Sequence, residues 1–276
     1  MWTILTNLFL QGYNLINRGA FLESAWYRRQ FARAYFLYKR HLEDPYAGLV
    51  RSHPELFRGG HIIDIGANIG YTATVFAKAV DPQYKVYAFE PDPVNFEMLR
   101  ETIARGYRDK VMPVQAAIGQ HEGAVELWRN PSNHADHRVW TSEFKDASPG
   151  ITPSLVTVPL VNLSKFLARE QINPSSACFI KIDVQGYELP VCLGMQITLD
   201  CNPELSVSLE YAPDLMKLMG FEPSELIELF GSRGFTFYEI NKRGKLNLLT
   251  DPKAACADPN GRGYVELLLS RKPLAV

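Results

Sequence analysis

The chain has 276 residues, enough for about two domains or for one large α/β domain with an appendage. Apolar residues make up 46% and charged residues 21%, which disfavours a disordered chain, a collagen or a coiled-coil rod. The formal net charge of −1 gives no electrostatic reason for nonspecific binding to a polyanion, so we expect no nucleic-acid partner without a local basic patch.

Residues 1–60 are predicted to form a helical N-terminal extension, and residues 61–276 a second domain. Residues 1–17 are uncharged but interrupted by polar side chains, which fits neither a signal peptide nor a spanning helix. Residues 1–42 are basic and aromatic. One helical face is expected there from spacings of 4, 4, 3 and 4 between Tyr27, Phe31, Tyr35, Tyr38 and Leu42. We interpret these helices as covering an edge of the following domain; a lid or contact with a membrane surface is the alternative.

From residue 61 onward, short β-rich runs alternate with helical stretches. The predicted strands are HIIDI, KVYAF, VMPVQAAI, CFIKID, LSVSLE, FTFYEI and YVELLL. The predicted helices are Tyr71–Val80, Pro93–Arg105, Leu163–Glu170, Tyr187–Met195 and Pro223–Ser232. This alternation predicts an α/β fold with a doubly wound, mostly parallel sheet of seven strands.

The alternation breaks in two places. A β-like run, Ala124–Trp128, leads into the polar stretch 129–150, which predicts a long loop of the kind that is often functional. At the C-terminal end, FTFYEI and YVELLL have no convincing helix between them, so they predict an antiparallel pair that closes the sheet.

The strongest local signal is the glycine loop HIIDIGANIGYT. A buried strand runs into Asp64, followed by Gly66, Asn68, Gly70 and then a helix. Glycines allow a ligand to approach the backbone closely, and a new helix offers unpaired N–H groups. The spacing is not the G-x-G-x-x-G of dinucleotide enzymes. An acid at the mouth would repel a pyrophosphate but suits an amino group or a sulfonium.

The next predicted strand ends at Glu90. A carboxylate at the tip of the second parallel strand can accept two hydrogen bonds from a ribose diol. We therefore expect the ligand to carry an adenosine-like sugar.

These motifs resemble those of FkbM-type methyltransferases, a branch of the class I S-adenosylmethionine-dependent enzymes with a Rossmann-like fold. The resemblance rests on D-I-G-A-N-I-G-Y-T at 64–72, F-E-P-D-P at 89–93 and I-K-I-D-V-Q-G-Y-E at 180–188. It implies that the loop around Gly66, Asn68 and Gly70 wraps the methionine part of S-adenosylmethionine. It also implies that Asp64 supports the loop and Glu90 holds the ribose. Position 185, more often acidic in this motif, is Gln185 here, and the first 60 residues have no equivalent.

Three acids follow the third and fourth parallel strands of the predicted crevice. Asp183 and Glu210 end their strands and should face the same pocket as Asp64 and Glu90, while Glu188 follows shortly after Asp183. The resemblance places Asp183 and Glu188 in this catalytic region. The alternative is that Asp183 caps the next helix and Glu188 lies in its first turn.

The long loop supplies further candidates. A base is needed when the methyl acceptor is an alcohol, and His137 is the first choice, with His134, Asp136 and Arg138 beside it. The loop could also fold over the acceptor and exclude water. The alternative is a solvated surface loop. These residues could instead join the carboxylates around a divalent cation, but their spacing does not require one, and we assign no metal.

The four cysteines (Cys178, Cys192, Cys201 and Cys256) have no zinc-ligand spacing and no disulfide framework, so we expect a reducing, cytoplasmic location.

The predicted function is S-adenosylmethionine-dependent methylation of a hydroxyl oxygen on a small-molecule, sugar or lipid-linked acceptor, the oxygen preference coming from the resemblance. A nicotinamide-dependent oxidoreductase would need a third close glycine after Gly70, and residue 73 is Ala73. A noncatalytic module that binds the nucleoside or a partner through the same pocket remains the other alternative.

Overall fold

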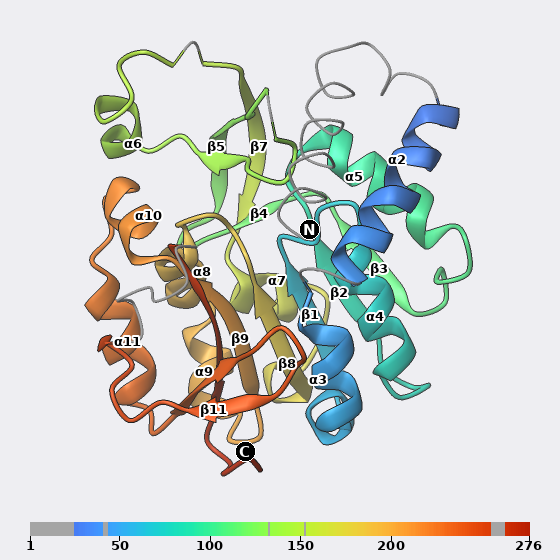
Figure 1. The fold of residues 1–276 in the computed structure, drawn as a ribbon, viewed down its shortest axis with the longest axis vertical. Coiled ribbons are helices and arrows are strands. Elements are labelled where there is room, and N and C mark those ends of the chain that lie inside the picture. Colours follow the sequence, from blue (N-terminus) through green and yellow to red (C-terminus); the bar gives the residue numbers. More distant parts are fainter. Residues whose placement is uncertain (1–24, 41–43, 132, 152, 255–262) are drawn as a thin grey trace, which may run out of the picture.

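A mostly parallel sheet of eight strands forms the centre of the molecule (Figure 1), in the order β11-β10-β12-β9-β8-β1-β2-β3. The computed structural model describes residues 25–40, 44–131, 133–151, 153–254 and 263–276. The strands of this sheet are β1 (His61–Ile65), β2 (Val86–Phe89), β3 (Val111–Val114), β8 (Ala177–Ile182), β9 (Ser206–Tyr211), β10 (Thr236–Ile240), β11 (Leu246–Leu248) and β12 (Val265–Ser270).

The predicted α/β fold is confirmed, and the sheet has one strand more than expected. Strands β3, β2, β1, β8 and β9 are parallel neighbours, and β12 lies antiparallel between β9 and β10, as the C-terminal pattern predicted. The eighth strand, β11, forms a hairpin with β10 around a tight turn in which the Asn241 N–H donates to the Lys245 carbonyl oxygen. Its sequence, Leu-Asn-Leu, is too short and too polar to predict a strand.

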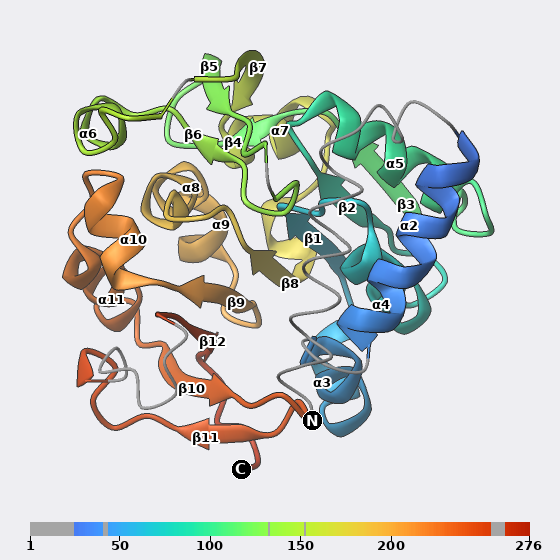
Figure 2. The ribbon, with the colours of Figure 1, turned by 45° about the horizontal axis from the view of Figure 1, so that its top comes forward.

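A second, four-stranded sheet was not predicted. Its order is β4-β7-β5-β6, and its strands are β4 (Ala117–Ile118), β5 (Gly123–Trp128), β6 (Arg138–Val139) and β7 (Leu155–Val161). Figure 2 shows this sheet, green to yellow, above the large sheet. The run VMPVQAAI, expected as one strand, is divided between β3 and β4 at a turn where the Ala116 N–H donates to the Val114 carbonyl oxygen. The expected loop 129–150 contains β6 and α6 (Ser142–Asp146).

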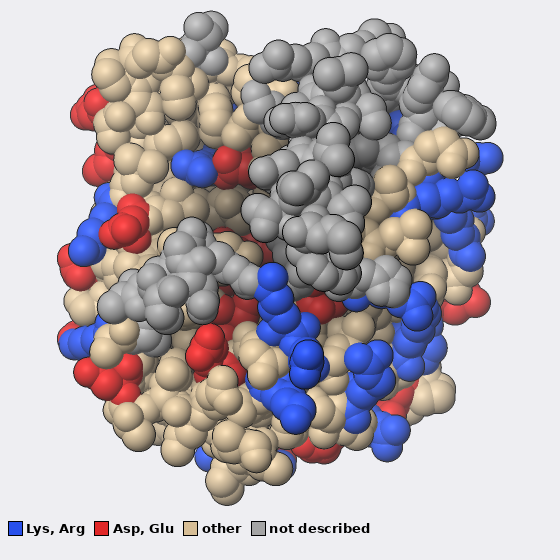
Figure 3. All heavy atoms as spheres, viewed as in Figure 1, with Lys and Arg blue, Asp and Glu red and all other residues tan. Residues whose placement is uncertain are grey.

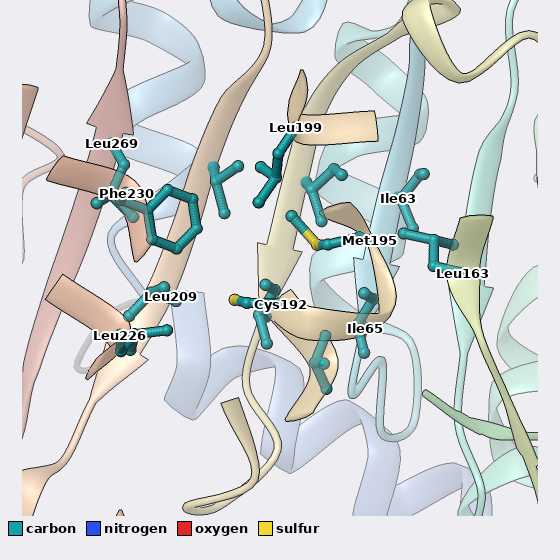
Figure 4. Close-up of a cluster of buried hydrophobic side chains, with 14 of the residues drawn as sticks. Ile63, Ile65, Leu163, Cys192, Met195, Leu199, Leu209, Leu226, Phe230 and Leu269 are labelled. Atoms are coloured by element: carbon teal, nitrogen blue, oxygen red, sulfur yellow. The ribbon is translucent and has the colours of Figure 1, made fainter. Parts of the chain in front are cut away.

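Helices cover both faces of the large sheet because its strands are apolar on both sides. On β1, Ile62 packs into one core, and Ile63 and Ile65 pack into the other. The first core faces α3 (Tyr46–Ser52), α4 (Tyr71–Ala79) and α5 (Pro93–Ile103). The second, shown in part in Figure 4, faces α7 (Leu163–Arg169), α8 (Glu188–Gly194), α9 (Gln196–Cys201) and α11 (Pro223–Gly231). Helix α3 lies within the predicted helical N-terminal extension, whereas helices α9 and α10 (Pro213–Leu218) were not predicted.

The described part of the N-terminal segment packs on the main domain. Helix α2 (Ala25–Tyr38) places Tyr35, 6% exposed, against Ile69, Tyr71 and Met98. The side chains of Tyr27 and Phe31, all of Leu42 and residues 1–17 lie outside the described residues, as does Cys256. Lys and Arg side chains gather on the face of the molecule where α2 lies (Figure 3).

The domain boundary at residue 60 stays a prediction. The short helix η3 (Pro54–Phe57), just before that boundary, shares a core with β1, just after it. In the described part of the chain, no helix has both the length and the apolar character needed to cross a membrane.

Candidate active site

A cavity of about 590 Å³ lies at the carboxyl ends of β1, β2, β8 and β9. This volume is typical of small-molecule sites, which occupy roughly 300–1,000 Å³. Most of the predicted site residues border it: Gly66, Asn68, Glu90, His134, Asp136, His137, Arg138, Asp183 and Glu210. Asp64, Gly70 and Glu188 are not among the lining residues.

Gly66 lets the glycine loop pack tightly between two strand ends. Its φ of 77° is left-handed, and a Cβ at this position would overlap the carbonyl oxygen of Asp183. The N–H groups of Gly66 and Ala67 both donate to the Phe89 carbonyl oxygen, at 3.0 and 2.9 Å. The loop therefore packs against the end of β2 on one side and the end of β8 on the other, in both cases through backbone atoms.

Glu90 is buried at the tip of β2, with 6% of its surface exposed. Its two carboxylate oxygens accept hydrogen bonds from the N–H groups of Asn68 (2.8 Å) and Asp92 (2.9 Å). Burial, and to a lesser degree the neighbouring charge of Asp92, raises the pKa of Glu90 to about 8. Each oxygen keeps a lone pair that could accept a further hydrogen bond from a ligand hydroxyl.

Asp64 lies behind the glycine loop and is fully buried. It accepts a hydrogen bond from the Thr72 hydroxyl at 2.7 Å, and one carboxylate oxygen lies 3.6 Å from the Lys181 ammonium. Burial raises the pKa of Asp64, although Lys181 and Thr72 partly offset the rise. These contacts suit the supporting role that was expected for Asp64.

Lys181 is a site residue that the sequence analysis missed. Its ammonium donates to the Gly66 carbonyl oxygen at 2.9 Å and lies 3.3 Å from Asp183 Oδ2. Burial lowers the pKa of Lys181, but the charges of Asp183, Asp64 and Glu266 outweigh it and leave the pKa raised. A lysine inside the apolar run CFIKID is the signal that could have identified it, since buried lysines need a partner.

Glu188 supports the turn after β8 from behind and does not contact the cavity. One of its oxygens accepts the N–H groups of Val184 and Gly186, both at 3.2 Å. Burial raises the pKa of Glu188 to about 7. Its position favours the structural alternative over the predicted catalytic contact.

Three carboxylates meet at the ends of β8, β9 and β12. Glu210 and Glu266 are cross-strand partners, and the Gln185 amide donates to Asp183 at 3.0 Å and to Glu210 at 3.3 Å. The Tyr46 hydroxyl donates to Glu266 at 3.2 Å. Glu266 and Tyr46 line the cavity but were not predicted.

The three carboxylates differ in pKa. Burial would raise the pKa of Asp183, but Lys181 and Lys39 outweigh it and leave the pKa lowered. Burial, followed by the charges of Asp183 and Glu266, raises the pKa of Glu210 well above its ordinary value. Burial and Asp183 raise the pKa of Glu266 to about 7. Lys181 and Lys39 therefore favour the ionised form of Asp183, whereas burial favours the protonated form of Glu210.

The loop 129–140 brings both histidines to the cavity wall, as predicted, but His137 is occupied. Its Nδ1 accepts the Asn130 N–H at 3.1 Å, so the ring proton of the neutral form is on Nε2, 3.9 Å from Asp92 Oδ2. Burial lowers the pKa of His137 to about 4. In this neutral tautomer the Nδ1 lone pair is already used by the Asn130 N–H, so none is left to take a proton from the methyl acceptor. The geometry therefore does not favour the predicted role of His137 as a base.

Asp92 anchors this loop to α5. It caps the helix by accepting the N–H groups of Val94 and Asn95, as expected of an N-cap, and it pairs with Arg129 at 2.7 Å. Asp136 and Arg138 form an ion pair with each other at 2.7 Å. Among the described residues, no three His, Cys, Asp or Glu side chains are grouped so that they could hold a metal ion.

The N-terminal segment also walls the cavity, through residues that include Tyr35, Lys39, Asp44 and Tyr46. The Tyr35 hydroxyl lies 3.5 Å from the side-chain amide of Asn68 in the glycine loop. The predicted edge-covering role of this segment therefore extends to the site itself.

Comparisons with known proteins place the chain among methyltransferases. The family model described as the methyltransferase FkbM domain matches residues 64–237. "Methyltransferase 1" of Beauveria bassiana is 28% identical over 145 residues, which are 49% of this chain and 57% of the relative. "Hexuronic acid methyltransferase AglP" of Haloferax volcanii is 25% identical over 133 residues, 48% of each chain. The chain thus matches about half the length of these curated relatives.

Among solved structures, the chain is similar to an O-methyltransferase from Bacillus cereus in complex with SAH. The identity is 12%, the alignment covers 95% of this chain and 88% of that one, and the TM-score is 0.46.

Proposed function

Because the chain belongs to the FkbM methyltransferase domain family, we propose that it transfers a methyl group from S-adenosylmethionine to a hydroxyl oxygen of a small-molecule, sugar or lipid-linked acceptor. The main support is that Gly66, Glu90 and Asp183 border one cavity. The name of the Haloferax volcanii relative specifies a hexuronic acid; we take it as support for the sugar character of the acceptor and not for its charge.

The residues at the ends of β1 and β2 suit the donor. Glu90 has a free lone pair on each oxygen for the ribose hydroxyls, and the Gly66–Asn68 segment presents backbone next to it. Asp183 lines the same cavity, and we assign it to the acceptor. When bound, S-adenosylmethionine supplies an electrophilic methyl group. The chain mainly holds the two reactants in line, which can contribute roughly 7–11 kcal/mol.

The acceptor hydroxyl must lose its proton as the new bond forms. Asp183 is a weak base because its pKa is lowered, and it suits orientation of the hydroxyl. Glu266 has a pKa of about 7, close to the value that makes a general base efficient near neutral pH. Burial favours the protonated form of Glu210, which can donate a hydrogen bond to an acceptor oxygen.

The decisive experiment is calorimetric titration of the purified chain with S-adenosylhomocysteine. Glu90→Ala should weaken the affinity roughly 10- to 100-fold, since it removes hydrogen bonds to a charged group. Glu97→Ala, on the exposed side of α5, serves as the matched control and should bind like the wild type. Absence of binding by the wild type, or unchanged affinity in Glu90→Ala with the fold intact, would contradict the proposed donor site.

A further inference from the structure

Among the described residues that line the cavity, carboxyl side chains outnumber cationic side chains, although burial favours the protonated forms of Glu90 and Glu210. Seven carboxyl side chains line the cavity: Asp44, Glu90, Asp136, Asp183, Glu210, Asp214 and Glu266. Four cationic side chains line it: Lys39, Arg138, Lys181 and Lys242.

Three of these cations act on carboxylates of the wall. Lys181 lies 3.3 Å from Asp183 and 3.6 Å from Asp64, and Arg138 lies 2.7 Å from Asp136. The charge of Lys39 favours the ionised forms of Asp183, Glu210 and Glu266, although burial still leaves the pKa values of the two glutamates raised. At these three cations an anionic acceptor would have to compete with the carboxylates and would meet their repulsion.

From this arrangement we propose that the acceptor is an uncharged polyhydroxyl molecule, such as a neutral glycoside, and that Glu266, held by Tyr46, selects it against anionic analogues. This inference rests on the proposed function. Both residues lie outside the family-matched span 64–237, so the selection belongs to the flanking parts of this chain.

The hydrogen-bonding groups of this wall match hydroxyl groups, which both donate and accept. Asp183 and the ionised form of Glu266 accept hydrogen bonds, whereas the protonated form of Glu210, which burial favours, can donate one. The cross-strand register of Glu210 and Glu266 places two carboxyl groups side by side, and such pairs share protons rather than carry two charges. Tyr187 and Tyr264 also line the cavity and offer ring surface to the apolar faces of a sugar.

A matched pair of probes tests the inference. Initial rates of transfer from methyl-tritiated S-adenosylmethionine are compared at pH 7.5 for p-nitrophenyl β-D-glucopyranoside and p-nitrophenyl β-D-glucuronide, and likewise for the galactoside and galacturonide. These pairs differ only in a CH₂OH group against a carboxylate. We expect the neutral member to react at least about tenfold faster, because like-charge repulsion near a buried carboxylate exceeds the free energy of a tenfold change.

Glu266→Gln should slow transfer to both members of each pair, because it removes the candidate base. It should also reduce the neutral-to-anionic rate ratio at least about fivefold while S-adenosylhomocysteine affinity stays unchanged, which also reports an intact fold. Glu228→Gln, on the exposed face of α11, is the matched control and should keep the wild-type ratio.

Several results would overturn the inference. One is an equal or faster rate with the uronides, and another is a ratio that Glu266→Gln leaves unchanged. Transfer to none of the four probes by a protein that binds S-adenosylhomocysteine would overturn the neutral-glycoside inference and leave the donor site standing. Failure to bind S-adenosylhomocysteine would instead overturn the proposed function.

Discussion

Lys181 and Asp64 are register partners on the neighbouring strands β8 and β1, and their charged groups lie 3.6 Å apart. The same ammonium contacts the Gly66 carbonyl oxygen and Asp183. One buried cation therefore joins the support of the glycine loop to Asp183, which lines the cavity. The part of the cavity that we propose for the donor and the part that we propose for the acceptor thus share a single side chain.

Lys181→Met should destabilise the protein by about 3–5 kcal/mol, because it leaves Asp64 buried without its counter-charge. Urea unfolding at pH 7 measures the loss. Lys165→Met, which removes a cation that is 65% exposed and 3.6 Å from Glu122, is the control and should cost about 0–1 kcal/mol. A loss below about 1 kcal/mol in Lys181→Met would show that the buried pair contributes little.

The sequence predicted the parts of the site that follow local rules. Asp64, Gly66 and Glu90 could be placed because a glycine turn and a strand-tip acid have recognisable spacing. Lys181 and Glu266 could not be placed, because their roles depend on which strands become neighbours. Each interrupts an apolar strand with a charge, but only the sheet order shows that Glu266 faces Glu210.

The second sheet was missed for a related physical reason. Strand β7 contains Pro159, and β4 has only two residues, so neither carries a strong strand signal. They pair across 42 intervening residues, as between Ala117 and Leu160. The loop that contains His137 was expected to be irregular. Its geometry is fixed by Asp92, which contacts Arg129 and His137, and by the Asn130 N–H, which donates to His137.

Binding of S-adenosylhomocysteine at pH 7 should release a proton. The pKa of Glu90 is about 8 without ligand, so the carboxyl group is mostly protonated at pH 7. Ribose hydroxyls that donate to Glu90 favour the ionised form and lower this pKa. Calorimetry in buffers of different ionisation enthalpy measures the release. Glu90→Gln should abolish it, and an unchanged release in that variant would place the titrating group elsewhere.

The same pKa predicts a pH-dependent effect of Glu90 on stability. Its pKa is about 8 in the folded protein and near 4.5 unfolded, so between these values the folded state binds more protons. This group therefore makes the protein less stable as pH rises from 4.5 to 8, by up to about 1.4 kcal/mol per pH unit. The stability of Glu90→Gln relative to wild type should accordingly rise from pH 5 to pH 8 in urea unfolding. A difference that does not vary with pH would contradict the raised pKa.

His137 should act on the loop and not on the acceptor proton. Asn has a side-chain oxygen close to the position of Nδ1, so His137→Asn should keep the acceptor for the Asn130 N–H, whereas His137→Ala loses it. Hydrogen exchange should show wild-type protection of the Asn130 amide in the first variant and at least about tenfold faster exchange in the second. Equal protection in both variants would mean that His137 does not hold the loop.

Gly48 determines how closely α3 approaches the β10–β11 hairpin, and thereby where Tyr46 lies. A Cβ at Gly48 would overlap the carbonyl oxygen of Arg243, although replacing a helical glycine by alanine normally stabilises a helix by about 1 kcal/mol. Gly231, in α11, has no atom near the position of an added Cβ and provides the matched control. We expect Gly231→Ala to be neutral or stabilising, and Gly48→Ala to lower the free energy of unfolding by about 1–3 kcal/mol.

Since Tyr46 donates to Glu266, Gly48→Ala should also shift the glycoside-to-uronide rate ratio towards that of Glu266→Gln while S-adenosylhomocysteine affinity changes less than about threefold. A destabilised Gly48→Ala protein with the wild-type ratio would show that acceptor selection does not depend on the position of α3.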